Sequence, residues 1–400
     1  MTLPETIPGD LAGIRLPEPG EDARRHSKLV RDRVLSEIRQ NGPVDFARYM
    51  EIVLYEPGLG YYSCGCDKLG KTGDFITAPE LSGLFTECLA RQVMEILDFM
   101  GTASLIEAGP GSGVMACNLL TYLEHLGCLP KHYYLLEVSA DLRKRQQHLF
   151  EQKIPHLMHM ISWLDEFPRE SLDAVVLGNE VLDAMPVNRI IREHNNWNEL
   201  FVSSDNGRLT WLSASLSHAA GRFVEEVMDS DDSLPDGYVT EINPRISPWI
   251  TALGNMINRG MLIFIDYGYP RREYFHSQRS GGTLLCHYQH HVHADPFVYP
   301  GLQDITASVD FTTLAESACM AGMQVSGYTT QAHFLLSCGL EESIQSVDHL
   351  PDQERFEIAR QARILTMPGE MGERFKVMAL AKNLELPLRG FQEFDQRARL

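Results

Sequence analysis

Residues 105–114 read Leu-Ile-Glu-Ala-Gly-Pro-Gly-Ser-Gly-Val, and this stretch decides the fold. An apolar strand ends at Glu107, glycines follow at every second position, and a helical pattern begins near Ser112. Glycines permit a tight turn whose backbone approaches a ligand without a Cβ in the way. The start of the helix offers N–H groups to that ligand. The stretch therefore predicts a strand–loop–helix unit that holds a nucleotide-like cofactor.

Around this unit, apolar strand patterns alternate with helical patterns. Such alternation predicts an α/β fold with a doubly wound parallel sheet. The predicted strands are Ser104–Glu107, Tyr133–Glu137, Ala174–Gly178, Met261–Asp266, Gln324–Thr329 and Arg374–Ala381.

Two segments do not follow the alternation. Residues 188–214 predict two or three antiparallel strands, joined at Asn195-Asn196 and at Asp205-Asn206-Gly207, which is a strong hairpin signal. Residues 269–310 are rich in His, Gly and Pro, which is more typical of an active-site lid than of a linker.

Composition limits the class of protein. The 400 residues carry a net charge of −19, which argues against the basic surface that nucleic-acid binding needs and suits a cationic ligand or a basic protein segment. No apolar run approaches the ~20 residues of a membrane span. The first 25 residues carry four prolines and five acids, unlike a transit or signal peptide, so we expect a cytoplasmic protein with reduced cysteines.

Two cofactor classes fit the glycine loop. Read as Gly109-x-Gly111-x-Gly113 after Glu107, it fits a methyltransferase that uses S-adenosylmethionine; read as Gly111-x-Gly113-x-x-Ala116, it passes a loose dinucleotide pattern. An acid at the strand end suits a ligand with an ammonium group and repels a pyrophosphate. Glu137, at the end of the second strand, can hold ribose hydroxyls in either class. Glu107 therefore favours S-adenosylmethionine over NAD.

The run Leu177-Gly178-Asn179-Glu180-Val181-Leu182-Asp183-Ala184-Met185-Pro186 makes the interpretation more specific. With the glycine loop, it resembles the MidA family of S-adenosylmethionine-dependent methyltransferases, whose mitochondrial members are linked to complex I assembly through protein arginine methylation. Further matching runs, which extend the likeness over about residues 40 to 385, are Tyr55–Tyr62, Gly73–Glu80, Ile265–Tyr269, Gly301-x-x-Asp304-Ile305-Thr306, Val309–Phe311 and Pro368–Gly372.

The resemblance implies a Rossmann-like, seven-stranded class I methyltransferase core with a helical N-terminal part and inserted segments. The expected organisation is a flexible leader (1–22), a helical N-terminal region (23–100), a core (101–187 and 255–385), an inserted subdomain (188–254) and a lid-like insertion (269–310). Because the chain has no recognisable transit peptide, a bacterial or other cytoplasmic member is expected, which puts the complex I substrate in doubt.

The cofactor is assigned to Glu107, Gly109, Gly111, Gly113 and Glu137. By analogy with the fold, Trp163 and Leu164 flank the adenine, although a tryptophan there is equally typical of plain core. Phe75 and Thr77 are expected to close over the cofactor, with Phe75 either facing the sulfonium or only packing.

The acceptor side is assigned to Asn179, Glu180 and Asp183, which follow the fourth strand. Two carboxylates can grip a guanidinium, orient one nitrogen and take up the released proton. The competing interpretation is that Glu180 and Asp183 only complement the dipole of a following helix. Asp266 and Tyr267 are expected to line the substrate cleft.

Other polar residues have weaker assignments. His287, His290, His291, His293 and Asp295 crowd one segment, but no metal is expected, because methyl transfer does not need one. Asp304 and Asp310 are interpreted as caps of a helix that begins near Phe311. We predict a methyltransferase that acts on a protein side chain, arginine favoured; a small-molecule methyltransferase and a non-catalytic assembly factor remain the alternatives.

Overall fold

The computed structural model describes residues 16–63, 76–168, 170–228, 234–346 and 349–400. The chain divides into two compact units. Unit 1 comprises residues 1–75, 183–246 and 271–308, and unit 2 comprises residues 76–182, 247–270 and 309–400. Each unit is therefore built from three separate stretches of chain.

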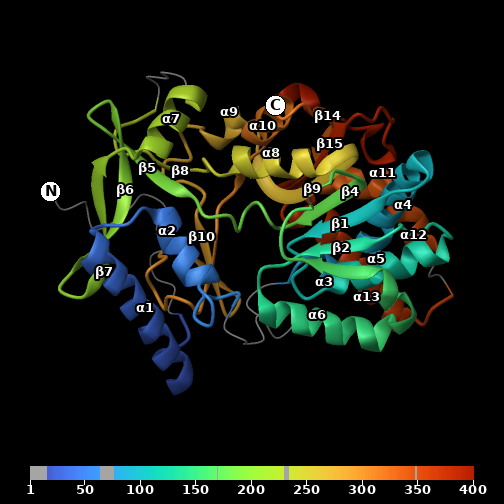
Figure 1. The fold of residues 1–400 in the computed structure, drawn as a ribbon, viewed down its shortest axis with the longest axis horizontal. Helices are drawn as coiled ribbons and strands as arrows, with labels where there is room; N and C mark the ends of the chain where they lie inside the picture. The colour runs from blue at the N-terminus through green and yellow to red at the C-terminus, as the bar shows by residue number, and fades with distance from the viewer. Residues whose placement is uncertain (1–15, 64–75, 169, 229–233, 347–348) are drawn as a thin grey trace. The chain divides into compact units, whose positions relative to one another are not determined.

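Unit 2 contains a central sheet with the order β14-β15-β9-β4-β1-β2-β3, and β13 pairs with β9 (Figure 1). Neighbouring strands are parallel from β3 to β9, and β15 runs antiparallel to both β9 and β14. The strands are β1 (Ser104–Ala108), β2 (Tyr133–Leu136), β3 (Ile161–Leu164), β4 (Leu172–Asn179), β9 (Ile257–Tyr269), β13 (Val309–Asp310), β14 (Gln324–Thr330) and β15 (Phe375–Lys382). The predicted α/β fold and all six predicted strands are confirmed.

Helices cover both faces of this sheet. On one face, the residues of α4, α5 and α6 share a hydrophobic core with Leu105, Leu135 and Val175. On the other face, α8 packs through Trp249 on Phe264 of β9, and α10 packs through Phe311 on Tyr328 of β14 (Figure 1). The helices are α3 (Ala78–Leu81), α4 (Gly83–Met100), α5 (Val114–His125), α6 (Ala140–Lys153), α8 (Ile246–Met256), α10 (Phe311–Met320), α11 (Gln331–Ser337), α12 (Leu340–Gln345), α13 (Asp352–Thr366) and α14 (Met371–Arg374), with short 3-10 turns at Pro155–Met160, Arg389–Phe391 and Arg397–Arg399.

Unit 1 combines helices with two small antiparallel sheets. One sheet has the order β7-β6-β5-β8 and the other β11-β10-β12. The strands are β5 (Asn188–Glu193), β6 (Asn196–Asp205), β7 (Arg208–Ser215), β8 (Val239–Ile242), β10 (Leu285–Tyr288), β11 (His291–His293) and β12 (Asp304–Thr306). The predicted antiparallel strands and both connections within 188–214 are confirmed, whereas the segment 269–310 contains a three-stranded sheet that its irregular composition did not reveal.

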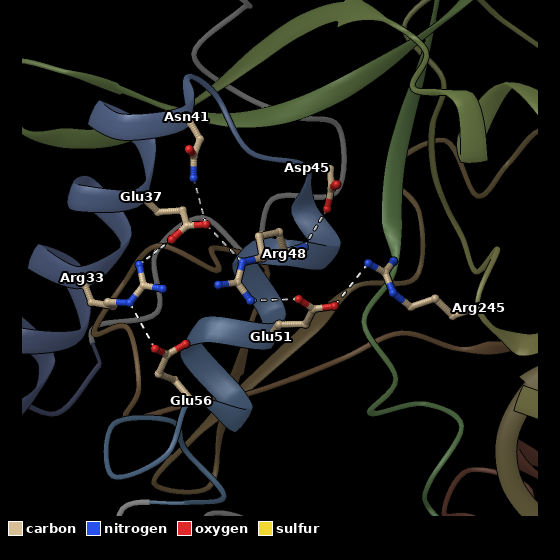
Figure 2. Close-up of polar contacts among 8 residues, drawn as sticks. All are labelled: Arg33, Glu37, Asn41, Asp45, Arg48, Glu51, Glu56 and Arg245. Carbon is tan, nitrogen blue, oxygen red and sulfur yellow. Dashed lines mark hydrogen bonds and ion pairs between the residues drawn. The ribbon is translucent and has the colours of Figure 1, made fainter.

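The helices of unit 1 are α1 (Glu21–Asn41), α2 (Phe46–Met50), the π-helix η1 (Glu51–Tyr55), α7 (His218–Val227) and α9 (Arg271–Tyr274). A hydrophobic core joins α1, α2 and η1 to Val202 of β6 and to Cys286 and Ile305 of the small sheet. Ion pairs in which arginine and glutamate alternate also connect α1 to α2 and η1 (Figure 2): they involve Arg33, Glu37, Arg48, Glu51, Glu56 and Arg245.

Among the described residues, no helix is both long and apolar enough to cross a membrane. The six cysteines that lie in the described part of the chain are all free thiols.

Candidate functional site

The strand order of unit 2 places a topological switch between β1 and β4. The chain runs from β1 outward to β2 and β3, and then returns to β4 on the other side of β1. At such a switch the loops that follow the two neighbouring strands diverge, and ligands bind at the carboxyl ends of the strands. Gly109 follows β1 there, and Asn179 ends β4.

The glycine loop that follows β1 can be built only with glycine at several positions. Gly109, Gly111 and Gly113 have φ angles of 63°, 53° and 82°, in the left-handed region. A Cβ on Gly109 would lie 2.7 Å from Cγ2 of Val181, and one on Gly113 would lie 3.1 Å from both Cγ of Gln146 and Cζ of Phe150. The loop therefore packs closely against the side chains of Val181, Gln146 and Phe150. Helix α5 begins directly after it at Val114.

Gln146 of α6 connects three parts of the predicted cofactor site. Its Nε2 donates to the carbonyl of Gly111 at 2.7 Å and to Oε2 of Glu137 at 3.2 Å, and its Oε1 accepts from Nε1 of Trp163 at 2.7 Å. The side chain is fully buried. Sequence reasoning missed Gln146; the available signal was its position one helical turn before Phe150, the other buried residue of α6.

Glu107 is a buried carboxyl at the end of β1. It is 1% exposed, and its Oε2 accepts a hydrogen bond from the hydroxyl of Tyr133 at 2.6 Å. Burial raises the pKa of Glu107 to about 7, the Tyr133 hydrogen bond lowers it in part, and the charge of Glu137 raises it further. A buried carboxyl poised in this way favours a ligand that brings a positive charge.

Glu137 and its neighbours form the end of β2. Glu137 is buried, and its Oε1 accepts from the backbone N–H of Ser139 at 2.7 Å. Burial raises its pKa, which the Ser139 and Gln146 hydrogen bonds lower in part. The guanidinium of Arg143 donates to the carbonyls of Glu137 and Leu164, at 2.7 and 3.0 Å, and so connects the ends of β2 and β3.

Trp163 and Val138 present apolar surface near these ends. The Trp163 ring is half-buried and stacks on Phe150 at 6.0 Å, and its indole N–H is bonded to Gln146. Val138, directly after Glu137, is 87% exposed. An exposed valine beside a buried carboxyl is a candidate contact for an aromatic base, and sequence reasoning missed it because nothing in the pattern marks a valine as exposed. Adenine contacts of Trp163 and Leu164 stay predictions.

Beyond β4, Glu180 has a strained backbone. Its φ is 52°, and its N–H donates to the carbonyl of Ile265 at 2.9 Å. Nδ2 of Asn179 donates to Oε1 of Glu180 at 3.1 Å. Oδ1 of Asn179 is buried and has no hydrogen-bond partner among the described residues, so it can accept a donor from a ligand.

The structure corrects the helix-dipole interpretation of the two acids, because residues 181–187 form a turn and irregular backbone rather than a helix. Glu180 belongs to unit 2, whereas Asp183 is the first residue of a segment of unit 1 and is 4% exposed. That both carboxylates bind the methyl acceptor stays a prediction.

Asp266 supports the turn that carries Glu180. Its Oδ2 accepts from the N–H groups of Val181 and Leu182, at 3.1 and 2.9 Å, and its Oδ1 accepts from the N–H of Tyr267 at 2.9 Å. Asp266 is 1% exposed, so these contacts assign it to positioning Glu180. Tyr267 is half-buried and packs edge-on against Phe375; its substrate contact stays a prediction.

The remaining predicted residues have separate outcomes. Phe75 lies outside the described residues. Thr77 is half-buried and precedes α3, whose Glu80 accepts a hydrogen bond from Ser112 of the glycine loop at 2.8 Å. Asp310 caps α10 as predicted, through Oδ1 and the N–H of Thr312, but Asp304 instead accepts from Tyr62. Across the described ranges, no three His, Cys, Asp or Glu side chains cluster as metal ligands.

The donor set fits S-adenosylmethionine. The left-handed glycines leave the loop without a Cβ at positions 109, 111 and 113. Glu107 and the buried Oδ1 of Asn179 can accept from an ammonium group, and Glu137 can accept from two ribose hydroxyls.

Three comparisons with known proteins agree with this geometry. Residues 88–329 match the model of a family described as S-adenosyl-L-methionine-dependent methyltransferases. The chain is 40% identical to a COG1565 superfamily member from Burkholderia thailandensis, whose crystal structure contains S-adenosyl-homocysteine; the TM-score is 0.91 over 96% of this chain and 100% of that one.

The curated relatives include mitochondrial proteins named protein arginine methyltransferase NDUFAF7. The one from Bos taurus is 29% identical over 90% of this chain and 85% of its own length. The one from Homo sapiens is 28% identical over 88% of this chain and 83% of its own length.

Proposed function

Because the chain belongs to the family of S-adenosyl-L-methionine-dependent methyltransferases, we propose that it methylates a protein side chain, at a guanidinium nitrogen of arginine. The relatives named protein arginine methyltransferase support this acceptor class. The observation that carries the proposal is the carboxylate of Glu180, held at the carboxyl end of β4 by Asn179 and by the strained turn that Asp266 supports.

The cofactor supplies, when bound, a methyl group on a sulfonium centre that leaves as a neutral thioether. The protein contributes alignment of the acceptor and exclusion of water. The glycine loop, Glu107 and Glu137 hold the donor, while the carboxylate of Glu180 accepts N–H bonds from the guanidinium and orients one nitrogen. As the new N–C bond forms and the S–C bond breaks, that nitrogen loses a proton, which the carboxylate takes up.

The acceptor class is tested by incubating the purified full chain and radiolabelled S-adenosylmethionine with a lysate from cells that lack the protein. We expect a labelled protein band whose hydrolysate contains methylated arginine. Label confined to small molecules would show a small-molecule methyltransferase, and label on lysine would overturn the arginine assignment.

Glu180→Gln tests the carboxylate. We expect this variant to bind S-adenosylhomocysteine with the affinity of the parent protein and to lose transfer by at least 100-fold, because the amide can neither take up the proton nor pair with a cation. Glu166→Gln, at an exposed glutamate of the same unit, is the matched control and should retain transfer. Undiminished transfer by Glu180→Gln would remove the carboxylate from the mechanism.

A further inference from the structure

Two sequence runs with no assigned role meet in unit 1. The hydroxyl of Tyr62 donates to Oδ1 of Asp304 at 2.7 Å, across 242 residues of sequence. The ring of Tyr62 stacks on that of Tyr55 at a centroid distance of 5.4 Å and an interplanar angle of 25°. The Tyr55–Tyr62 run and the Asp304–Thr306 run are therefore in contact, although neither belongs to the cofactor loop.

The segment that follows β4 is hydrogen-bonded to both of these runs. The hydroxyl of Tyr55 donates to the carbonyl of Ala184 at 2.7 Å. The N–H of Ala307, just beyond β12, donates to the carbonyl of Asp183 at 3.0 Å. Asp183, three residues after Glu180 in the chain, is thereby attached to β12 and to the tyrosines.

One face of the small sheet β11-β10-β12 is apolar, and the opposite face is mixed, with Leu285 opposite Thr306 in the register. Ile305 and Ala307 pack in the core of unit 1 together with Cys286 of β10. Because side chains alternate along a strand, Asp304 and Thr306 lie on the opposite face. His287 of β10 is directly opposite Asp304 in the register and shares that face.

The two polar side chains that β12 places on this face are buried. Asp304 and Thr306 are only 2% and 3% exposed. Oγ1 of Thr306 has no hydrogen-bond partner among the described residues. Leaving a buried polar atom without a partner is unfavourable, so a hydroxyl in this position indicates a site that a ligand completes.

The charge of the face selects the ligand. Burial raises the pKa of Tyr62 well above its ordinary value, and the negative charges of Asp304 and Asp183 raise it further, so the phenol stays a hydrogen-bond donor beside two carboxylates. Carboxylates beside tyrosine rings suit a planar cation that both pairs and stacks. Arginine does this better than lysine, because its guanidinium is flat and presents a fork of N–H donors.

We propose that Tyr55, Tyr62, Asp183, Asp304 and Thr306, the tyrosine–carboxylate face, bind an arginine side chain of the substrate protein other than the one that Glu180 orients. The inference rests on the proposed function and deepens it, because it assigns substrate recognition to residues of unit 1. Asp304 and Asp183 pair with the guanidinium, and Thr306 accepts a further N–H beside the stacked pair of tyrosine rings.

Binding is tested on the full chain without any methyl transfer. The probe is N-acetyl-L-argininamide, titrated by NMR and compared with N-acetyl-L-lysinamide and the neutral N-acetyl-L-citrullinamide. We expect the arginine compound to bind most tightly, and Asp304→Asn and Tyr62→Phe each to weaken it at least tenfold without changing the affinity for S-adenosylhomocysteine. Equal affinities for the charged and neutral compounds, or undiminished binding by Asp304→Asn, would overturn the inference.

Two further variants guard against a folding artefact. Thr306→Val keeps the shape of the side chain and removes only a hydroxyl without a described partner. It should leave the near-UV circular dichroism unchanged and lower the affinity for N-acetyl-L-argininamide several-fold. Asp205→Asn removes an exposed carboxylate from the β6–β7 hairpin of the same unit and should bind the probe as the parent does. Parental probe binding by Thr306→Val would contradict the role given to its hydroxyl.

The inference and the proposed function can fail separately. If the lysate assay labels no protein but the probe binds through Asp304, the face stands and the transfer reaction is wrong. If arginine in a protein is labelled, and Asp304→Asn leaves KM for that protein unchanged, the reaction stands and the face is wrong. If the face recognises the substrate, Asp304→Asn should raise KM for that protein at least tenfold and leave kcat nearly unchanged.

Discussion

At the scale of single residues, Glu107 shows a conflict between function and stability. A carboxyl that is 1% exposed would be deleterious in a core, and its pKa is raised from 4.5 to about 7. Between these values the folded state holds a proton that the unfolded chain releases, so stability falls as pH rises through this window. Above pH 7 the loss approaches ~3 kcal/mol, because each unit of pKa shift corresponds to about 1.4 kcal/mol.

Glu107→Gln should therefore stabilise the ligand-free protein and weaken the binding of the cofactor. At pH 8 we expect a free energy of unfolding higher by ~3 kcal/mol, because the amide carries no charge to bury, and at pH 5 we expect the difference nearly to vanish. Denaturant titrations at both pH values measure it, and calorimetry should show S-adenosylhomocysteine binding at least tenfold weaker at pH 8. A variant that is less stable than the parent at pH 8 would show that Glu107 is not a buried charge.

At the scale of elements, the network in Figure 2 connects α1 to α2 and η1. Glu37 lies at its centre, between Arg33 at 2.6 Å and Arg48 at 3.4 Å, with its side chain 15% exposed. The hydrogen bond from Arg33 holds the pKa of Glu37 below its ordinary value. The stability that it contributes is therefore present above the ordinary pKa of 4.5 and is lost as pH falls through the lower pKa of the folded state.

Glu37→Gln should cost about 1 kcal/mol of unfolding free energy at pH 7. The cost should shrink in 1 M NaCl, which screens the arginines. Urea titrations at both salt concentrations measure it. Glu18→Gln breaks an ion pair whose side chains are 71% and 57% exposed, and as the matched control it should change little. Equal effects of the two substitutions would mean that the network adds nothing beyond surface pairing.

At the scale of the whole molecule, two units share one chain, and the residues assigned to the cofactor that the structure describes belong to unit 2. A ligand that binds only the folded state stabilises it, by about 2.7 kcal/mol at a concentration of 100 times Kd. That stabilisation should be greatest where the ligand's own contacts lie. The tyrosine–carboxylate face, in unit 1, is expected to respond to an arginine compound instead.

Hydrogen exchange can separate the two responses. With S-adenosylhomocysteine, we expect slower amide exchange at residues 109–114 and 137–139 and unchanged exchange in the β6–β7 hairpin. With N-acetyl-L-argininamide, we expect protection at residues 304–307. Mass spectrometry of peptides from the full chain measures both. Exchange in the glycine loop that S-adenosylhomocysteine leaves unaltered would remove this loop from the cofactor site.

Sequence patterns within a few neighbouring residues made much of the fold predictable. The six strands follow from runs of apolar residues, and the 188–214 hairpins follow from turn residues with left-handed backbone, such as Asn206 and Gly207. The start of α4 at Gly83 is also set locally, because Ser82 is extended and its side chain accepts a hydrogen bond from the N–H of Leu84. The sheet of residues 285–306 was missed because its strands are three or four residues long.

The α/β class and the glycine loop follow from the sequence alone, because strand periodicity and glycine spacing act over a few neighbouring residues. The methyl donor was predicted from the acid at Glu107 and above all from the family resemblance of the run from Asn179 to Pro186. The folded structure was needed to see that Gln146 connects Gly111, Glu137 and Trp163, and that Asp266 holds the turn that follows Glu180. It alone brought Tyr62 to Asp304. Such contacts join residues up to 242 positions apart, and no local period encodes which distant side chain completes a buried hydrogen bond.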